Sequence, residues 1–249
     1  MHAIKNGVGW ARSGAAAAAA AALAAAGTAL ALGMGAAATA RADMAMPPEP
    51  PAPPPAGPAK VRVMNASPDL GPTELWIDGK KAAGGAAGYK KSSGFAKVTA
   101  GKHKIEAFTV KAKGAGTPVY SLDDVWDGGK SYTIFICGMA AETTTATLEH
   151  DAAAPAAGKA RARFFHGAPG LEVVDAAFTD GPSLAERIAY GSNSAYADLD
   201  PGKWALALKQ AGYDKVLETF PALALAKGKI YTVVVAGPEG KREAFLVTE

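Results

Sequence analysis

The stretches "GKSYTIFICG" (residues 129–138) and "GKIYTVVVAG" (residues 228–237) decide the fold class of this chain. They start 99 residues apart and share a Gly-Lys turn, a Tyr-Thr pair and an apolar run. Near-continuous apolar runs bounded by turn residues are typical of a central β-strand that is covered on both faces. The pair therefore indicates two copies of one β-structured unit.

The similarity extends outward from these strands in the same order. "GYKKSSGFAKVTAGKHKIEA" (88–107) corresponds to "AYGSNSAYADLDPGKWALAL" (189–208), and "VRVMNASPDL" (61–70) corresponds to "ARFFHGAPGL" (162–171). A period near 100 residues indicates a duplicated domain, because solenoid repeats are shorter. We expect repeat 1 at 60–151, a linker at 152–158 and repeat 2 at 159–249.

Each copy is predicted to be all-β. Short runs rich in Val, Ile, Thr, Phe and Tyr alternate with Gly, Pro and Asp turns. In a pleated strand, Trp204, Leu206 and Leu208 share one face. The pattern predicts two tandem immunoglobulin-like β-sandwich domains, each with its own core. Cys137 is the only cysteine, so no intramolecular disulfide can form.

The first 42 residues have the three-part pattern of a signal peptide. Lys5 and Arg12 precede an alanine-rich apolar run, which small residues close at 38–42. The alternative is an uncleaved signal anchor, because the run exceeds the roughly 18 residues typical of a membrane span. The alanine richness favours cleavage, and no membrane span is then expected to remain. A proline-rich linker at 43–59 should form a polyproline II spacer. Together these segments predict a secreted, periplasmic or cell-surface protein.

The two copies differ in their numbers of basic and acidic residues. The chain has 26 Lys and Arg against 23 Asp and Glu. This near balance lacks the excess of positive charge that is typical of nucleic-acid-binding proteins. Residues 80–113 hold nine lysines against one acid, whereas residues 180–214 hold three basic residues against five acids. One interpretation is an ordinary solvated face. The other is attraction to an anionic polysaccharide or another envelope component. The candidate binding lysines are Lys90, Lys91, Lys102 and Lys104.

The stretch "NASPD" raises the question of catalysis at Ser67. A serine nucleophile needs a base and an oxyanion hole. Copy two has Ala168 at this position and keeps the following proline, so Ser67 is interpreted as a corner residue. The variable position, Asn65 in copy one and His166 in copy two, is a candidate ligand-binding site. No catalytic residue is predicted.

Three other side chains have a binding and a packing interpretation. Trp76 should face away from Leu75 and Ile77, where it could stack on a sugar ring or pack against a loop. His103 is expected to be a partly buried core residue, and Cys137 a small buried hydrophobe. The histidines lack convergent ligands, so neither a metal site nor a cofactor is predicted.

The order of "VRVMNASPD", "ELWIDGK", "VTAGKHKIEA" and "GKSYTIFICG" resembles the bacterial family catalogued as domain of unknown function 4397. The resemblance covers residues 60–249, once per copy. It implies a secreted or surface-displayed β-sandwich, often in tandem, with no established activity. The chain departs from the family pattern at Asn65, where the family often has His, and at residues 168–170, where Ala-Pro-Gly replaces Ser-Pro-Asp.

These observations favour a non-enzymatic binding or structural protein of the cell envelope or extracellular space. One alternative is a hydrolase with its site at the cleft between the domains. Another is a subunit of a surface structure that assembles by strand addition at open sheet edges. The sequence does not predict the oligomeric state.

Overall fold

The computed structural model describes residues 57–112, 116–150 and 153–249. The predicted signal peptide and most of the proline-rich linker lie outside the described residues. The described part is all-β, with 17 strands and one short 3-10 helix, η1 (Val110–Ala112). None of its helices is long and apolar enough to span a membrane. The all-β prediction is therefore confirmed.

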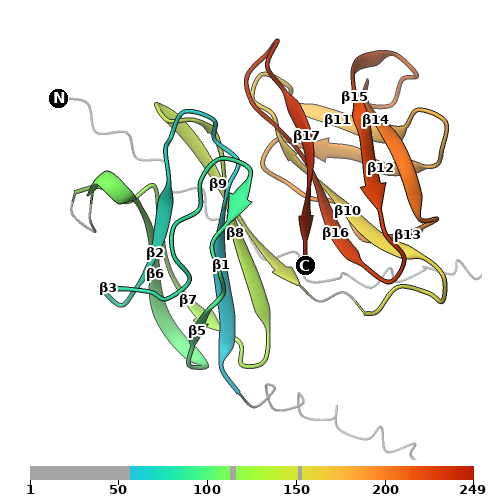
Figure 1. Ribbon diagram of the computed structural model, residues 1–249. Coiled ribbons are helices and arrows are strands. Elements are labelled where there is room, and N and C mark those ends of the chain that lie inside the picture. Colours follow the sequence, from blue (N-terminus) through green and yellow to red (C-terminus); the bar gives the residue numbers. More distant parts are fainter. Residues whose placement is uncertain (1–56, 113–115, 151–152) are drawn as a thin grey trace, which may run out of the picture. The chain divides into compact units, whose positions relative to one another are not determined.

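Repeat 1 consists of two sheets that face each other (Figure 1). We call the sheet built on the first strand sheet A and the other sheet B. In spatial order, sheet A contains β4 (Lys91–Ser92), β1 (Ala59–Asn65), β8 (Ser131–Met139) and β9 (Glu142–His150), with β5 (Ala96–Val98) also paired to β1. Sheet B contains β3 (Lys80–Lys81), β2 (Thr73–Ile77), β6 (Gly101–Thr109) and β7 (Tyr120–Trp126).

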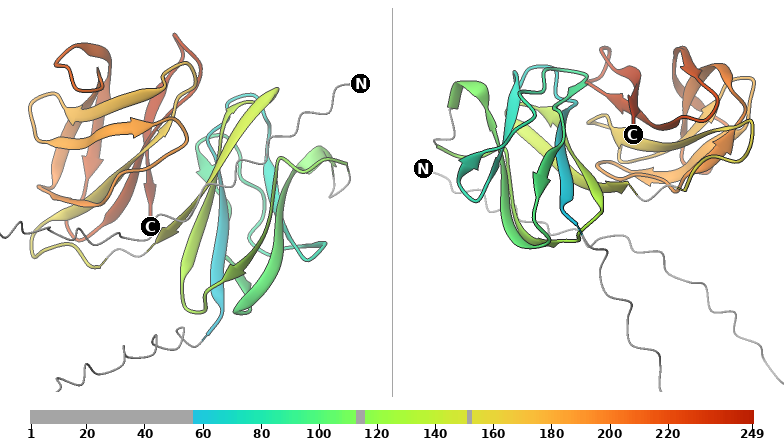
Figure 2. Two further views of the ribbon diagram at one scale, coloured as in Figure 1. Left: turned by 180° about the vertical axis from the view of Figure 1, so that it is seen from behind. Right: turned by 60° about the horizontal axis from the view of Figure 1, so that its bottom comes forward.

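Repeat 2 is built in the same way, as the two further views show (Figure 2). Sheet C contains β13 (Ala197–Leu199), β10 (Ala160–Gly167), β16 (Ile230–Ala236) and β17 (Glu243–Thr248). Sheet D contains β12 (Ser183–Ala189), β11 (Val173–Phe178), β14 (Gly202–Gln210) and β15 (Val216–Leu225). In both repeats the first strand pairs in parallel with the strand of the Tyr-Thr run, β1 with β8 and β10 with β16. The shared topology agrees with the duplication seen in the sequence, whereas the immunoglobulin-like assignment stays a prediction.

Each repeat has its own hydrophobic core between its two sheets. In repeat 1, Trp126 packs edge-on against Tyr132, with ring centroids 4.9 Å apart. In repeat 2, Leu206 and Leu208 lie in the core and Trp204 packs against it, as the alternation of β14 predicts. Two separate cores are what the sequence leads us to expect.

A third apolar cluster joins the two repeats. It lies on the faces of sheets A and C that point away from their own cores, and includes Met64 and Phe135 of repeat 1 with Phe165 and Val234 of repeat 2. The rings of Phe135 and Phe165 are 4.5 Å apart. This cluster explains why β8 and β16 are apolar on both faces: one face lies in the repeat's own core, and the other is covered by the neighbouring repeat.

Candidate functional site

The corner after β1 is held by the side chain of Asn65. Its Nδ2 donates to the carbonyl oxygen of Gly71 at 2.6 Å, and its Oδ1 accepts the N–H of Ser67 at 2.9 Å. Ser67 is fully buried, and its Oγ lies 3.3 Å from an oxygen of Asp69. A buried hydroxyl cannot reach a substrate, so the geometry supports the interpretation of Ser67 as a corner residue.

His166 has the same role in repeat 2. Its Nε2 donates to the carbonyl oxygen of Leu171 at 3.0 Å, and its Nδ1 accepts the N–H of Ala168 at 3.4 Å. Burial lowers the pKa of His166 to about 4, which keeps the ring neutral. Asn65 and His166 are both fully buried, and their polar atoms bond within the corner. The structure gives this pair a role in folding instead of a surface for a ligand.

Lys102 and Lys104 lie on the outer face of sheet B, as the alternation of β6 predicts. Lys104 forms an ion pair with Glu106 at 2.9 Å, and the hydrogen bond to that carboxylate raises the pKa of Lys104. The register of β6 with β7 also places Lys104 opposite Asp123. Carboxylates therefore interrupt this row of lysines.

Lys90 and Lys91 lie on the other side of the repeat, at the β4 edge of sheet A. Lys90 forms an ion pair with Glu243 of repeat 2. Both lysines, with Ser92 and Met64, line an open pocket of about 380 Å³ that residues 246–248 of β17 border from the side of repeat 2. The four candidate lysines thus form two separate groups, and Lys90 and Lys91 border this pocket.

Trp76 points away from the core of repeat 1 and packs on its own sheet. Its Nε1 donates to Glu74 at 3.2 Å, and its ring lies edge-on to Phe108, 5.8 Å between centroids. Glu74 is only 3% exposed and also forms an ion pair with Lys81. The indole is half-buried, so these contacts favour the packing interpretation and leave part of the ring exposed.

His103 is partly buried, as expected, and its ring bonds to polar groups at the end of sheet B. The ring hydrogen bonds to Thr99 Oγ1 at 2.8 Å and to Asp78 Oδ2 at 2.6 Å. The N–H of Lys104 also donates to Asp78, and the hydrogen bond from His103 lowers the pKa of this carboxyl group. These contacts join the turn after β2 to the turn before β6, which explains why the ring bonds there instead of entering the core.

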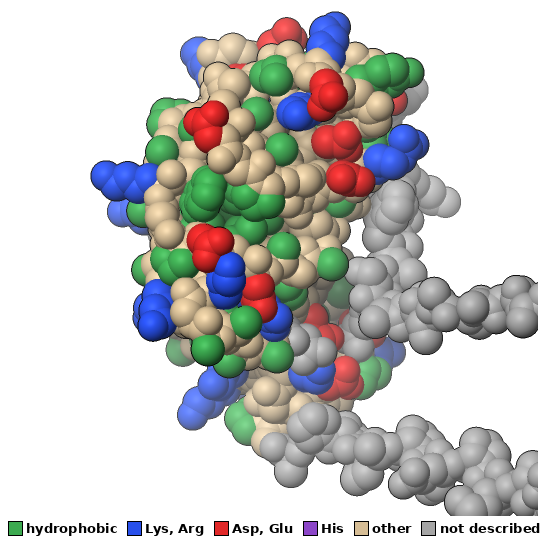
Figure 3. Space-filling view, turned by 90° about the vertical axis from the view of Figure 1, so that its right-hand side faces the viewer, with side chains coloured by type: hydrophobic (Ala, Val, Ile, Leu, Met, Phe, Trp, Pro, Cys, Tyr) green, Lys and Arg blue, Asp and Glu red, His purple; other side chains and the backbone are tan. Residues whose placement is uncertain are grey.

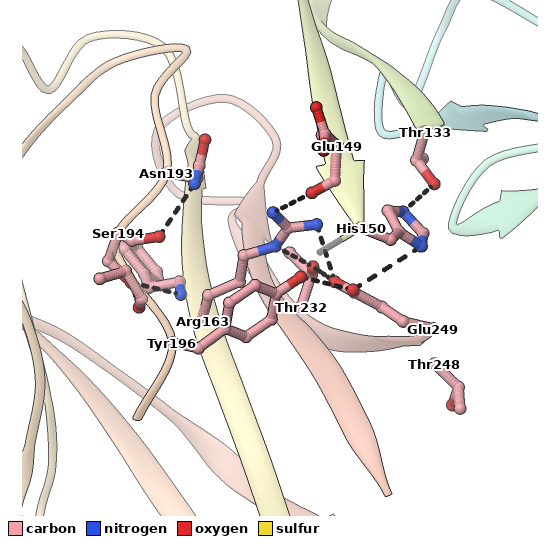
Figure 4. A network of polar contacts seen from close by, with 12 residues as sticks. Thr133, Glu149, His150, Arg163, Asn193, Ser194, Tyr196, Thr232, Thr248 and Glu249 are labelled. Carbon is pink, nitrogen blue, oxygen red and sulfur yellow. Dashed lines mark hydrogen bonds and ion pairs between the residues drawn. The ribbon is translucent and has the colours of Figure 1, made fainter. Parts of the chain in front are cut away.

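The polar contacts between the repeats centre on two buried arginines. Arg163 of β10 is 3% exposed and uses all three guanidinium nitrogens (Figure 4). Nε donates to Thr232 Oγ1 at 3.0 Å, Nη1 to the carbonyl oxygen of Glu149 at 3.0 Å, and Nη2 to Glu249 Oε1 at 2.8 Å. Arg163 therefore joins its own sheet to the last strand of repeat 1.

Arg62 of β1 makes the corresponding contacts from repeat 1. Its Nε donates to Thr133 Oγ1 at 2.9 Å, and its Nη2 donates to the carbonyl oxygen of Thr248 at 2.9 Å. The guanidinium lies over the ring of Phe95, 4.6 Å from its centroid. Each arginine thus binds a threonine of its own repeat and a backbone carbonyl of the other.

His150 and Glu249 lie between the two arginines. His150 Nε2 is 2.6 Å from Thr133 Oγ1, and its Nδ1 is 3.7 Å from Glu249 Oε2. Burial lowers the pKa of His150 to about 4. Burial opposes ionisation of Glu249, yet the charge of Arg163 and hydrogen bonds from its neighbours keep the pKa of this carboxyl below its usual value. The centre therefore holds a neutral imidazole beside an ionised carboxylate.

This Thr–His–Glu arrangement resembles a catalytic triad but lacks an accessible nucleophile. Thr133 is fully buried, and its Oγ1 also accepts the N–H of Arg62. A small pocket of about 260 Å³ reaches His150 and Glu249, lined also by Phe95. Among the described residues, no group of three or more His, Cys, Asp and Glu could hold a metal ion. The arrangement is suited to holding two sheets together.

Sequence reasoning missed the two arginines, although a signal was present. Arg62 and Arg163 occupy corresponding positions 101 residues apart, each between two apolar residues of its strand. Their partners Thr133 and Thr232 also correspond, in the Tyr-Thr pairs of β8 and β16. A charged residue between apolar neighbours in both copies is a signal of a buried partner, although Lys60 and Arg161, two residues earlier, show the same pattern and are more exposed.

Two solved structures of low sequence identity are similar to this chain. The C-terminal domain of AlgF from P. aeruginosa is 22% identical over 37% of this chain and 99% of that domain, with a TM-score of 0.29. A fimbrial assembly protein from Parabacteroides distasonis is 12% identical over 77% of this chain and 95% of its own, with a TM-score of 0.21. No curated protein matches the sequence.

One family profile matches the chain, that of the domain of unknown function DUF4397. The match covers residues 59–177, from the first residue of β1 to strand β11 of repeat 2. It includes the buried corner of repeat 1 with Asn65 and Ser67, and both interface arginines. The chain is thus similar to the DUF4397 family over residues 59–177.

Proposed function

We propose that this protein is a non-enzymatic binding or structural module, secreted or held in the bacterial cell envelope, that recognises anionic envelope glycans through repeat 1. The signal-peptide pattern of residues 1–42 and the proline-rich spacer support the location. The family adds no activity to this proposal. Burial of Ser67 and Thr133 speaks against the alternative of a hydrolase at the junction of the repeats.

The observation that carries the proposal is the pocket beside β4. Lys90 and Lys91 border it with the hydroxyl of Ser92, and Lys91 forms no ion pair with a described residue. Its apolar side is made by Met64 and Leu246. A concave surface that combines cations, a hydroxyl and apolar contacts suits a carboxylated, sulfated or phosphorylated sugar.

The outer face of repeat 2 lacks this one-sided charge. In the view that looks onto repeat 2, Lys and Arg side chains alternate with Asp and Glu around apolar atoms (Figure 3). Ion pairs of this repeat include Arg161–Asp198 and Lys159–Asp200. We therefore assign glycan binding to repeat 1, and we expect repeat 2 to contribute by bordering the pocket.

Chromatography on an immobilised anionic polysaccharide, with a neutral dextran column as reference, tests this proposal. We expect Lys90→Gln/Lys91→Gln to lower the salt concentration that elutes the protein more than Lys102→Gln/Lys104→Gln does. The matched control is Lys227→Gln/Lys229→Gln, which removes two exposed lysines from repeat 2. An equal shift for all three double variants would show non-specific attraction to net charge and would refute the proposal.

A further inference from the structure

The contacts between sheets A and C occur in pairs that the duplication relates. Arg62–Thr133 in repeat 1 corresponds to Arg163–Thr232 in repeat 2, with Nε to Oγ1 distances of 2.9 and 3.0 Å. The carbonyl groups that the arginines reach across the interface, those of Thr248 and Glu149, also occupy corresponding positions 99 residues apart. The interface therefore has the form of a two-fold dimer contact within one chain.

The aromatic rings over the arginines obey the same relation. Phe95 covers Arg62 and Tyr196 covers Arg163, both with 4.6 Å between Cζ and the ring centroid. Phe95 and Tyr196 are again 101 residues apart. A second unit of the same fold is thus the partner that this face of each repeat fits.

One charged position breaks the correspondence. The residue after Glu149 is His150, whereas the residue after Thr248 is Glu249. Both side chains contact the threonine of their own repeat, Thr133 for His150 and Thr232 for Glu249. The carboxylate of Glu249 also accepts hydrogen bonds from Arg163 and from the Tyr196 hydroxyl. It is 4% exposed and is the carboxylate that balances this cluster.

This difference decides which pairs of repeats can form. Two copies of repeat 1 joined through this face would bury the guanidinium of Arg62 twice, and among the described residues the position of Glu249 would be taken by the neutral His150. A buried cation without a counter-charge is strongly unfavourable. Repeat 2 supplies the missing carboxylate through Glu249.

We propose that the outer face of sheet A is a recognition surface for an unlike repeat, and that the carboxylate of Glu249 determines this specificity. The partner is repeat 2 of the same chain. The inference does not rest on glycan binding, because its test measures the association of the repeats, although Thr248 contacts Arg62 and also lines the lysine pocket.

The full chain can test the proposal once the covalent connection is removed after folding. A specific protease site replaces residues 153–158, and the folded protein is cleaved there. We expect the two halves of the wild-type sequence to stay together as a one-to-one complex in size-exclusion chromatography and native mass spectrometry at micromolar concentration. Glu249→His removes the carboxylate and should weaken this complex by about 100-fold or more. Glu239→His, at an exposed position of repeat 2, is the matched control.

An exchange of the two central residues gives the decisive variant. His150→Glu with Glu249→His moves the carboxylate to the corresponding position of repeat 1, beside Thr133 and the interface arginines. We expect this double variant to recover association to within about tenfold of wild type. Near-UV circular dichroism of the uncut chains checks that each variant folds. Separation of the wild-type halves, undiminished association of E249H, or a double variant no better than E249H would each overturn the proposal.

Discussion

Replacing Arg163 with alanine should destabilise the protein far more than replacing its neighbour Arg161. Arg163 is 3% exposed and donates three hydrogen bonds, one of them to the ionised Glu249. Its removal leaves that carboxylate, itself 4% exposed, without its cation. Breaking a buried ion pair in this way costs about 3–5 kcal/mol of unfolding free energy.

Arg161 is the matched control because it lies two residues earlier on the same strand. Its partner is Asp198 at 2.7 Å, and both side chains are about a quarter exposed. Such an ion pair is screened by solvent, so Arg161→Ala should cost about 0–1 kcal/mol. Urea unfolding followed by circular dichroism and by tryptophan fluorescence measures both variants, and the two probes show whether the repeats still unfold together.

The pH dependence separates loss of charge balance from loss of packing. Without Arg163, burial should raise the pKa of Glu249 above its unfolded value. This raised pKa lowers the free energy of unfolding at pH values above the pKa of the unfolded state. The loss disappears as the pH falls and the carboxyl group of Glu249 binds a proton. The stability difference between wild type and Arg163→Ala should therefore shrink as the pH falls from 7 to 4. Equal losses for the two arginine variants, or a difference independent of pH, would refute this account of the interface.

Three further predictions concern buried groups. Burial lowers the pKa of His150 and of His166 to about 4, below the value near 6.5 in the unfolded chain. The two histidines should therefore not reduce the free energy of unfolding above about pH 6.5. It should fall by up to about 3 kcal/mol per histidine as the pH decreases toward 4, because the unfolded chain binds these protons first. His166→Asn, the residue of repeat 1 at this corner, should flatten the urea midpoint against pH, and an unchanged slope would contradict the assignment. Burial raises the pKa of Cys137 to about 12, so its thiol should not react with an aromatic disulfide reagent until the protein unfolds, and rapid reaction of the native protein would disprove this. Gly138 has φ +87°, and an added Cβ would lie 2.5 Å from a backbone oxygen, so Gly138→Ala should cost about 1–3 kcal/mol in urea unfolding. Gly88→Ala, in open space, is its control and should change stability by less than about 0.5 kcal/mol.

The fold could be predicted from the sequence because local patterns determine it. Leu75 and Ile77 face the core of repeat 1, and Leu206 and Leu208 that of repeat 2, as the alternation of their strands requires. The apolar run of β8 also indicated a strand covered on both faces. What covers the second face could not be predicted, since many apolar surfaces would satisfy the same run.

The sites were harder to predict because their partners are distant in sequence. Exposure of Lys102 and Lys104 followed from strand alternation. The ion pair of Lys90 with Glu243 spans 153 residues and both repeats, and no local pattern indicates it. His103 was placed in the core from its strand face alone, whereas Asp78, 25 residues earlier, decides where its ring bonds.

The interface arginines show how a duplicated sequence can reveal a contact that neither copy reveals alone. A single arginine in an apolar strand, such as Arg62 between Val61 and Val63, can be a strand-edge residue that reaches solvent. The second copy has an arginine at the same position, Arg163. If both arginines reached solvent, each would have to do so from between two apolar residues of its strand. Burial of both is favourable only if each meets acceptors at fixed positions. The same face of the other copy supplies these hydrogen-bond acceptors. An arginine between apolar residues in both copies therefore indicates that the two copies pack on each other through these strands.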